Sequence, residues 1–331
     1  MLRIFHNTTY DFIRWWRVAV GLTVAFIAIG IGSLAIKGVN YSIEFTGGTL
    51  KQLSFKTPID AGKIRSTMDR AGFHDAEIQQ FGSPRDFTLR FRGAEEVAAQ
   101  SAGAELVSKR VDTVLYSAFG RNNVTVVRTE AISPTVGSEL RRNAIIAILL
   151  SFAITLVYLA IRFEWRFGLA AIIATGHDVF TTLAFVKLLH LEVSLTVVAA
   201  LLTVLGYSLN DTIIIFDRVR EDLRKGRKES LYDTLNRAIN ETLPRSILTH
   251  ATTAAATLAL LLFAGEVIRP FAWVMLFGIV TGTFSSIYIA GPVLIWIERK
   301  YPRNVPATAW KGSSTATPTS RTKPSAATAT R

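Results

Sequence analysis

One acidic residue, Asp211, lies inside an apolar stretch long enough to cross a membrane. The surrounding sequence is GYSLNDTIIIFDRVRE over residues 206 to 221, which puts Asp211 about 8 Å before the end of the apolar run at 1.5 Å per residue. A charge in hydrocarbon is costly unless it is paired, hydrated or neutralised, so such an acid indicates a function by default. We expect Asp211 to handle protons or ions. The alternative is a carboxylate held permanently by a partner helix.

Short polar side chains and one arginine are expected around this acid. Ser208, Asn210 and Thr212 flank it and can hold water or hydrogen-bond the carboxyl. Arg245 precedes the next apolar run, and two antiparallel helices joined by one loop bring it to a similar depth. Burial favours the neutral acid and a guanidinium favours the carboxylate, so a group between these influences can titrate at physiological pH. Snorkelling of Arg245 to lipid headgroups is the alternative.

Two histidines and a second aspartate lie in other apolar runs. The pair His177 and Asp178 suggests a proton relay or a metal site. Adjacent helix positions diverge by about 100°, however, so the two cannot both face Asp211, and a helix-to-helix hydrogen bond is the favoured interpretation. His250, one turn beyond Arg245, is either a further polar partner or a packing residue. We expect no metal, no cofactor and no enzymatic reaction.

The composition is that of an integral membrane protein. Half of the 331 residues are hydrophobic, and the mean hydropathy of +0.32 is too high for one soluble domain of this length. The formal net charge is +12, but lysine and arginine gather beside the ends of apolar runs, where they determine topology. Nucleic acid is therefore not an expected partner. The chain has no cysteine, which excludes disulfides and thiolate metal sites.

Six segments reach the ~20 residues that a hydrocarbon core of ~30 Å requires. The last is interrupted by Gly291 and Pro292. The expected spans are 18–36, 143–161, 167–189, 193–216, 246–264 and 271–297.

The distribution of basic residues predicts the orientation of these spans in the membrane. Basic residues are dense before the first span, between the second and third, and from Arg218 to Arg245, whereas the other short connections contain only Arg269. Both termini are therefore expected in the cytoplasm. Tryptophans near the boundaries are interfacial anchors or pack between helices: Trp15, Trp16, Trp165 and Trp296. The expected domains are 1–36 (cytoplasmic N-terminus and first helix), 37–140 (exterior domain), 141–300 (remaining helices, with a basic loop at 217–243) and 301–331 (disordered cytoplasmic tail).

The exterior segment has the pattern of a small α/β domain. Strands are predicted at 50–57, 76–82, 86–93 and 123–132, and helices at 58–72 and 94–119. The order βαββαβ is that of a ferredoxin-like fold. The segment FTGGT, residues 45–49, permits a tight turn or a close backbone approach, and a plain turn is the favoured interpretation.

Two further patterns predict packing and surface structure. Gly278 and Gly282 are spaced for close helix approach in lipid, and packing alone explains them. Leucines and an isoleucine recur at helical spacing in the basic loop and predict an interfacial amphipathic helix: Leu223, Leu231, Leu235 and Ile239.

Motifs in five places resemble the SecD/SecF family of protein translocase subunits, in the resistance-nodulation-division superfamily. The resemblance covers residues 1 to about 300, and Glu44 stands where the family usually has aspartate. The motifs are GVNYSIEFTGGTL (38–50), VGSELRRNAI (136–145), GHD (176–178), GYSLNDTIIIFDRVRE (206–221) and TLPRSILTHATT (242–253).

The resemblance implies a function and a set of partners. It implies association with the paralogous subunit SecD in a twelve-helix unit beside the SecYEG channel. That unit draws the translocating polypeptide outward with the proton-motive force after SecA has pushed from the cytosol. Asp211 resembles the family's proton-handling carboxylate and Arg245 resembles its partner.

Two other classes of protein remain as alternatives. A small-molecule or lipid exporter of the same superfamily would require a second large exterior loop. An intramembrane aspartyl protease would require two facing aspartates, nominally Asp178 and Asp211, but the apolar runs lack the GxGD and YD motifs of that class.

Overall fold

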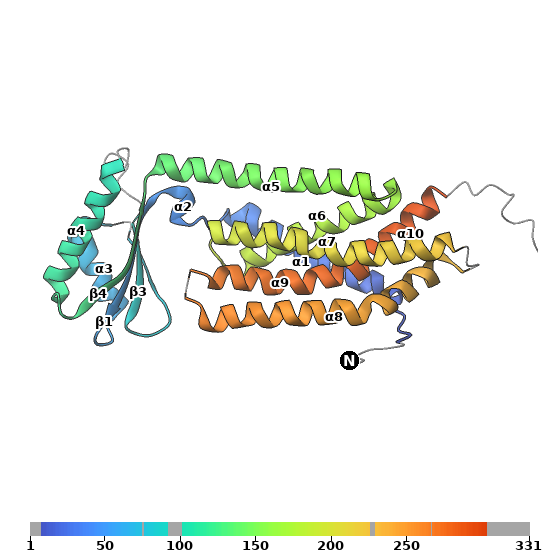
Figure 1. Ribbon diagram of the computed structural model, residues 1–331. Coiled ribbons are helices and arrows are strands. Elements are labelled where there is room, and N and C mark those ends of the chain that lie inside the picture. The colour runs from blue at the N-terminus through green and yellow to red at the C-terminus, as the bar shows by residue number, and fades with distance from the viewer. Residues whose placement is uncertain (1–7, 75, 92–100, 226–228, 266, 303–331) are drawn as a thin grey trace, which may run out of the picture.

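The computed structural model describes residues 8–74, 76–91, 101–225, 229–265 and 267–302. A bundle of long helices carries a small sheet domain at one end (Figure 1). Most of the predicted tail, residues 303–331, and the start of the helix predicted at 94–119 lie outside this described part.

The six predicted spans are confirmed as helices long and apolar enough to cross a membrane. A short 3-10 turn (Ile13–Trp15) precedes the first. The helices are α1 (Trp16–Lys37), α5 (Pro134–Arg162), α6 (Trp165–Leu188), α7 (Leu195–Arg224), α8 (Leu231–Phe263) and a last span composed of α9 (Arg269–Ser285), the π-helical turn η2 (Ser286–Ala290) and α10 (Gly291–Lys300). The last span is therefore interrupted as predicted, by a π-helical turn that ends immediately before Gly291. Pro292 has no N–H for the helical ladder, which favours a π turn on its N-terminal side.

The helices form a buried inner layer and an exposed outer layer. In the apolar windows of α6, α7 and the last span, 50 to 67% of residues are buried, against 11% in α1, α5 and α8. The inner layer therefore forms the core of the bundle, and the apolar outer faces are left to lipid or to other helices.

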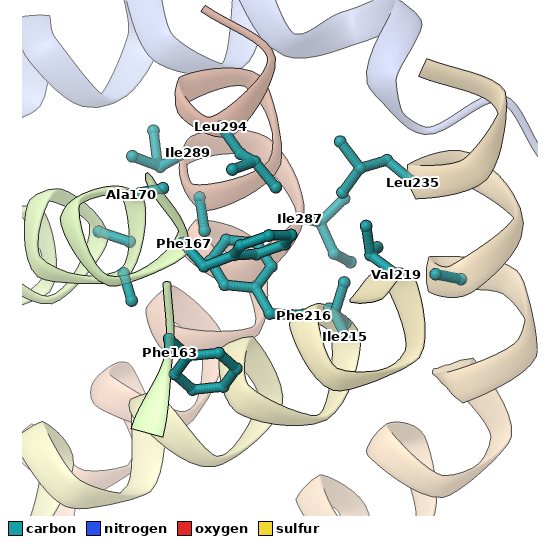
Figure 2. Close-up of a cluster of buried hydrophobic side chains, with 14 of the residues drawn as sticks. Phe163, Phe167, Ala170, Ile215, Phe216, Val219, Leu235, Ile287, Ile289 and Leu294 are labelled. Atoms are coloured by element: carbon teal, nitrogen blue, oxygen red, sulfur yellow. The ribbon is translucent and has the colours of Figure 1, made fainter. Parts of the chain in front are cut away.

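Aromatic packing fixes the end of the bundle away from the sheet. Figure 2 shows Phe163, Phe167 and Phe216 packed together, and the rings of Phe167 and Phe216 lie 5.3 Å apart in an edge-to-face contact. Leu235 and Ile239 of α8 are fully buried in the same cluster. The predicted interfacial helix is therefore wrong: these residues begin a continuous α8, and their helical spacing reflects packing in the bundle.

Small residues on α9 allow α9 to approach α7 closely, as predicted. A Cβ atom added to Gly278 would lie 2.2 Å from Val204 Cγ2, and one added to Gly282 would lie 3.0 Å from Ser208 Cβ. Neither position can carry a larger side chain without moving the two helices apart.

The sheet domain has the predicted ferredoxin-like topology. Its elements are β1 (Gly48–Phe55), α3 (Ala61–Arg70), β2 (Glu77–Gln80), β3 (Asp86–Phe91), α4 (Ser101–Phe119) and β4 (Val124–Ile132). The strand order is β2-β3-β1-β4 and every neighbouring pair is antiparallel. Alternate residues such as Leu53, Phe87 and Leu89 are buried in one core with residues of α3 and α4.

The glycines that precede β1 form more than the plain turn favoured from the sequence. They follow a short helix, α2 (Ile43–Thr46). Gly47 has φ +76°, and a Cβ atom there would lie 2.7 Å from Pro134 at the start of α5. The turn therefore also brings two backbones into contact where the sheet domain joins the bundle.

Candidate functional site

Asp211 is buried inside the bundle and only partly satisfied. It lies on α7, and 3% of its surface is exposed. Its Oδ2 atom is 3.3 Å from Nε2 of His250 on α8. Its Oδ1 atom is buried and has no hydrogen-bond partner within the described part of the chain. Because most buried polar atoms are hydrogen-bonded, this unsatisfied oxygen requires an explanation.

His250 is held in place from two neighbouring helices. Its Nδ1 atom is 2.9 Å from the Thr283 hydroxyl of α9, and the ring of Tyr207 on α7 lies 5.3 Å away between centroids. The other ring nitrogen faces Asp211. A ring nitrogen and a carboxylate oxygen attract only if a proton lies on one of them, so the contact between His250 and Asp211 requires a proton on Nε2 or on the carboxyl.

Arg245 does not contact the carboxylate directly. It is exposed, and it lines a hollow bounded by residues of α5, α7 and α8. The Ser246 hydroxyl lies within reach of Asp211 as a hydrogen-bond donor, and Arg245 acts on the carboxyl through its charge. However, no ion pair within 4 Å joins Arg245 to Asp211 in the described residues. The structure thus places His250, not Arg245, against the acid.

The polar residues that flank Asp211 in the sequence have other partners. Thr212 is 2.8 Å from the Ser286 hydroxyl in the π-helical turn, and Ser208 donates to Asp178 on α6. Asn210 is exposed. In the described part of the chain, none of these three side chains therefore forms the expected hydrogen bond with the Asp211 carboxyl. Neighbouring positions on a helix point in different directions, and α6 and α9 occupy those directions.

Asp178 forms a second buried polar cluster. It is 1% exposed and accepts hydrogen bonds from Ser208 of α7 and from Ser285 of α9, the latter at 2.7 Å. His177 Nδ1 lies 3.1 Å from its other oxygen. These contacts agree with the helix-to-helix interpretation. In the part of the chain described, no hydrogen bond links Asp178 to Asp211, and the two carboxylates contact different side chains.

The sequence analysis missed Thr283, Tyr207 and Ser285. Ser285 lies on α9 with Gly278 and Gly282, whose spacing was explained by packing alone, and it is buried and donates a hydrogen bond to Asp178. One signal could have identified them: hydroxyl side chains in apolar spans need hydrogen-bond partners when they are buried.

The start of α7 is bonded to the segment that leads into the sheet domain. The backbone N–H of Leu195 donates to Glu44 Oε2, and that of Ser42 donates to the Val193 carbonyl at 3.0 Å. Arg90 of β3 forms an ion pair with Glu192 just before α7. The start of α7, the helix that carries Asp211, is therefore attached to the sheet domain and to the segment that precedes it.

Together these features define a class: a polytopic membrane protein with a ferredoxin-like domain between its first two spans and buried carboxylates in its third and fourth. The family model described as protein export membrane protein SecD/SecF, C-terminal, matches residues 112–300. The SecD/SecF GG motif matches residues 32–59. The chain belongs to the SecD/SecF family.

Named relatives resemble nearly the whole chain. Protein translocase subunit SecF of Gemmatimonas aurantiaca is 65% identical over 305 residues, which cover 92% of this chain and 91% of that protein. Protein translocase subunit SecF of Escherichia coli O157:H7 is 36% identical over 291 residues, 88% of each chain.

A solved structure shares the fold. The crystal structure of SecDF from Thermus thermophilus, a translocon-associated membrane protein, superposes with a TM-score of 0.77 at 35% identity. The match covers 88% of this chain but 39% of the SecDF chain. This chain therefore corresponds to well under half of that protein.

Proposed function

We propose that this chain is the SecF-type subunit of a Sec protein translocase and that it couples proton flow across the inner membrane to polypeptide export. Relatives named protein translocase subunit SecF, similar over nearly the whole chain, support this proposal. The partners are a SecD chain, the SecYEG channel and the exported polypeptide, with SecA acting from the cytosol. The match to 39% of a SecDF chain is consistent with a separate SecD subunit that supplies six more helices.

In this proposal the sheet domain is exterior and both termini are cytoplasmic. The dense basic residues at the opposite end of the bundle support that orientation. The chain then acts as a motor subunit of the secondary-transport type and catalyses no covalent reaction.

The state of Asp211 carries the proposal. One of its oxygens is unsatisfied and the other is 3.3 Å from His250 Nε2, so the site holds a proton that either side chain can carry. Arg245 precedes His250 on α8 and provides a fixed positive charge that stabilises the carboxylate once the proton has left. A static structural ion pair would show neither the unsatisfied oxygen nor the shared proton.

Loading and release of this proton would change how α7 and α8 attract each other. The change reaches the exterior domain through the start of α7, where Leu195 is bonded to Glu44 and Glu192 is paired with Arg90. By linkage, movement of the domain must also alter the proton affinity of the site. A membrane potential of ~100 mV supplies about 2.3 kcal/mol per charge moved, enough to bias a two-state element strongly.

The test is reconstitution of the chain with SecD, SecYEG and SecA in vesicles that hold a proton gradient. We expect Asp211→Asn to abolish the gradient-dependent part of polypeptide release while ATP-driven entry continues. The matched control is Asp217→Asn, six residues further along α7, where the carboxylate is half-exposed and paired with Arg162. Gradient-dependent release that survives in the Asp211 variant would refute the mechanism.

A further inference from the structure

A cationic hollow lies at the end of the bundle away from the sheet domain. Its volume is about 710 Å³, and it is bounded by the ends of α5 and α7 and by the first half of α8. Six basic and two acidic side chains line it, together with Ile214 and Thr242: Arg162, Arg218, Arg220, Arg224, Lys225, Arg245, Asp217 and Glu221.

The two acidic side chains do not neutralise the six basic side chains that line the hollow. Asp217 is already shared between Arg162 and Arg220, and Glu221 is shared between Arg218 and Lys225. A surplus of positive charge and of N–H donors therefore remains in the hollow.

Among the described residues, two arginines without a counter-ion, and one N–H of Arg220, make up that surplus. Arg224 and Arg245 form no ion pair within 4 Å among the residues described. The Nε atom of Arg220 is buried and has no hydrogen-bond partner there. A buried guanidinium N–H without an acceptor is costly, and guanidinium groups match the oxygen geometry of phosphate. The unfilled donors point to an anionic ligand.

The hollow lies at the depth of lipid headgroups. Helix α7 has 30 residues, a length of about 45 Å, so it extends well beyond a hydrocarbon core of ~30 Å. Its last turns, which carry Arg220 and Arg224, are therefore expected at the membrane surface. Trp165 and Trp296 are exposed at the same end of the bundle, as is typical of an interfacial belt.

We propose that this hollow is a binding site for a phosphate-bearing anion, with Arg220, Arg224 and Arg245 as its donors. The ligand is the phosphodiester of an anionic phospholipid or a soluble phosphate, since both present the same oxygens. Binding should weaken as salt rises, because a site at the surface is screened by ions.

The test measures which lipids the purified full-length chain retains. The protein is equilibrated in mixed micelles that contain phosphatidylglycerol and phosphatidylcholine in equal amounts, and retained lipid is counted by native mass spectrometry. We expect Arg220→Gln combined with Arg224→Gln to lower retained phosphatidylglycerol about fivefold. The control, Arg14→Gln with Arg17→Gln, removes the same charge from exposed positions before and within the first turn of α1 and should leave retention unchanged.

Two further measurements distinguish a lipid ligand from a soluble phosphate and control for misfolding of the variants. Displacement of the lipid by inorganic pyrophosphate below ~1 mM would assign the site to a soluble phosphate, and resistance to it would assign the site to the lipid. If the double variant shows a lowered melting temperature, Arg224→Gln alone, at an exposed guanidinium, replaces it. Equal loss in the hollow and control variants, or no loss in either, overturns the proposal.

Discussion

Asp178 and Asp211 lie on neighbouring helices and are equally buried, yet their surroundings differ. Asp178 is contacted by three polar side chains, Ser208, Ser285 and His177. Asp211 lies 3.3 Å from His250 and within reach of the Ser246 hydroxyl, and its Oδ1 atom has no hydrogen-bond partner in the described part of the chain. Burial alone therefore does not separate a structural acid from a working one. Under the proposed function, the number of donors that meet each carboxylate makes that distinction, because a fully bonded charge resists change and a partly bonded one can be switched.

A third carboxylate extends the comparison to the outer domain. Asp86 at the start of β3 accepts from the hydroxyls of Ser54 and Ser83 at 2.7 and 2.6 Å. Like Asp178, it accepts hydrogen bonds from two serines, but Asp86 is only partly buried. Comparing the two separates the effect of the donors from the effect of burial.

Replacement of the structural acid should have the largest effect. Asp178→Leu removes the acceptor of the buried Ser208 hydroxyl and leaves Ser285 with the Gly282 carbonyl alone, and we expect a loss of about 3 kcal/mol of unfolding free energy. Asp211→Leu removes an unsatisfied oxygen and should cost less than about 1 kcal/mol. Denaturant unfolding in detergent micelles measures both, and equal losses would contradict the distinction between the two sites.

Separation of α7 from α9 should have the next largest effect. Gly278→Ala places a methyl group against Val204 and should cost about 2 kcal/mol through overpacking.

The matched control is Gly206→Ala on α7, where a Cβ atom has nothing within 4 Å. This change should leave stability the same or raise it slightly, because alanine is the better helix former. The same unfolding assay reports both substitutions. A similar loss in the two variants would mean that the glycines act through flexibility and not through close packing.

The fold could be predicted in large part because its signals are local. Span length, hydropathy and the alternation of apolar residues depend on a few adjacent positions, and they gave the six helices and the βαββαβ order. The wrong interfacial helix arose where a local pattern has two interpretations: Leu235 and Ile239 would be spaced in the same way on a membrane surface and in a bundle core.

The site was predicted only in part because its geometry depends on how the helices are rotated. The cost of a buried charge identified Asp211, but no local signal shows that Ser208, three residues earlier, turns to Asp178 on α6. The contact between Asp211 and His250 likewise depends on the angle between α7 and α8, which packing of the whole bundle determines.

Replacement of His250, next to Asp211, and of His177, next to Asp178, should affect different properties of the protein. We expect His250→Gln to slow gradient-dependent release about tenfold, equivalent to 1.4 kcal/mol in the barrier, because Asp211 loses the partner that shares its proton. His177→Gln should leave release within about twofold but lower stability, because His177 contacts the structural acid. The release assay and the unfolding assay together test this pair, and a reversed result would exchange the roles of the two clusters.

The smallest effect is expected at Asp86, where water can replace the serines. The Ser83 and Ser54 hydroxyls hold the pKa of Asp86 below its usual 3.8. A lowered folded-state pKa means that the carboxylate contributes stability above the unfolded pKa, and that this contribution is lost as pH falls through the folded value. Asp86→Asn should therefore cost well under about 1 kcal/mol at neutral pH, with solvent screening, and the difference should vanish as pH falls from neutral through the folded-state pKa. Unfolding curves of both proteins across that range measure the difference. A loss as large as that of Asp178→Leu would show that the serine donors, and not burial, make an acid structural.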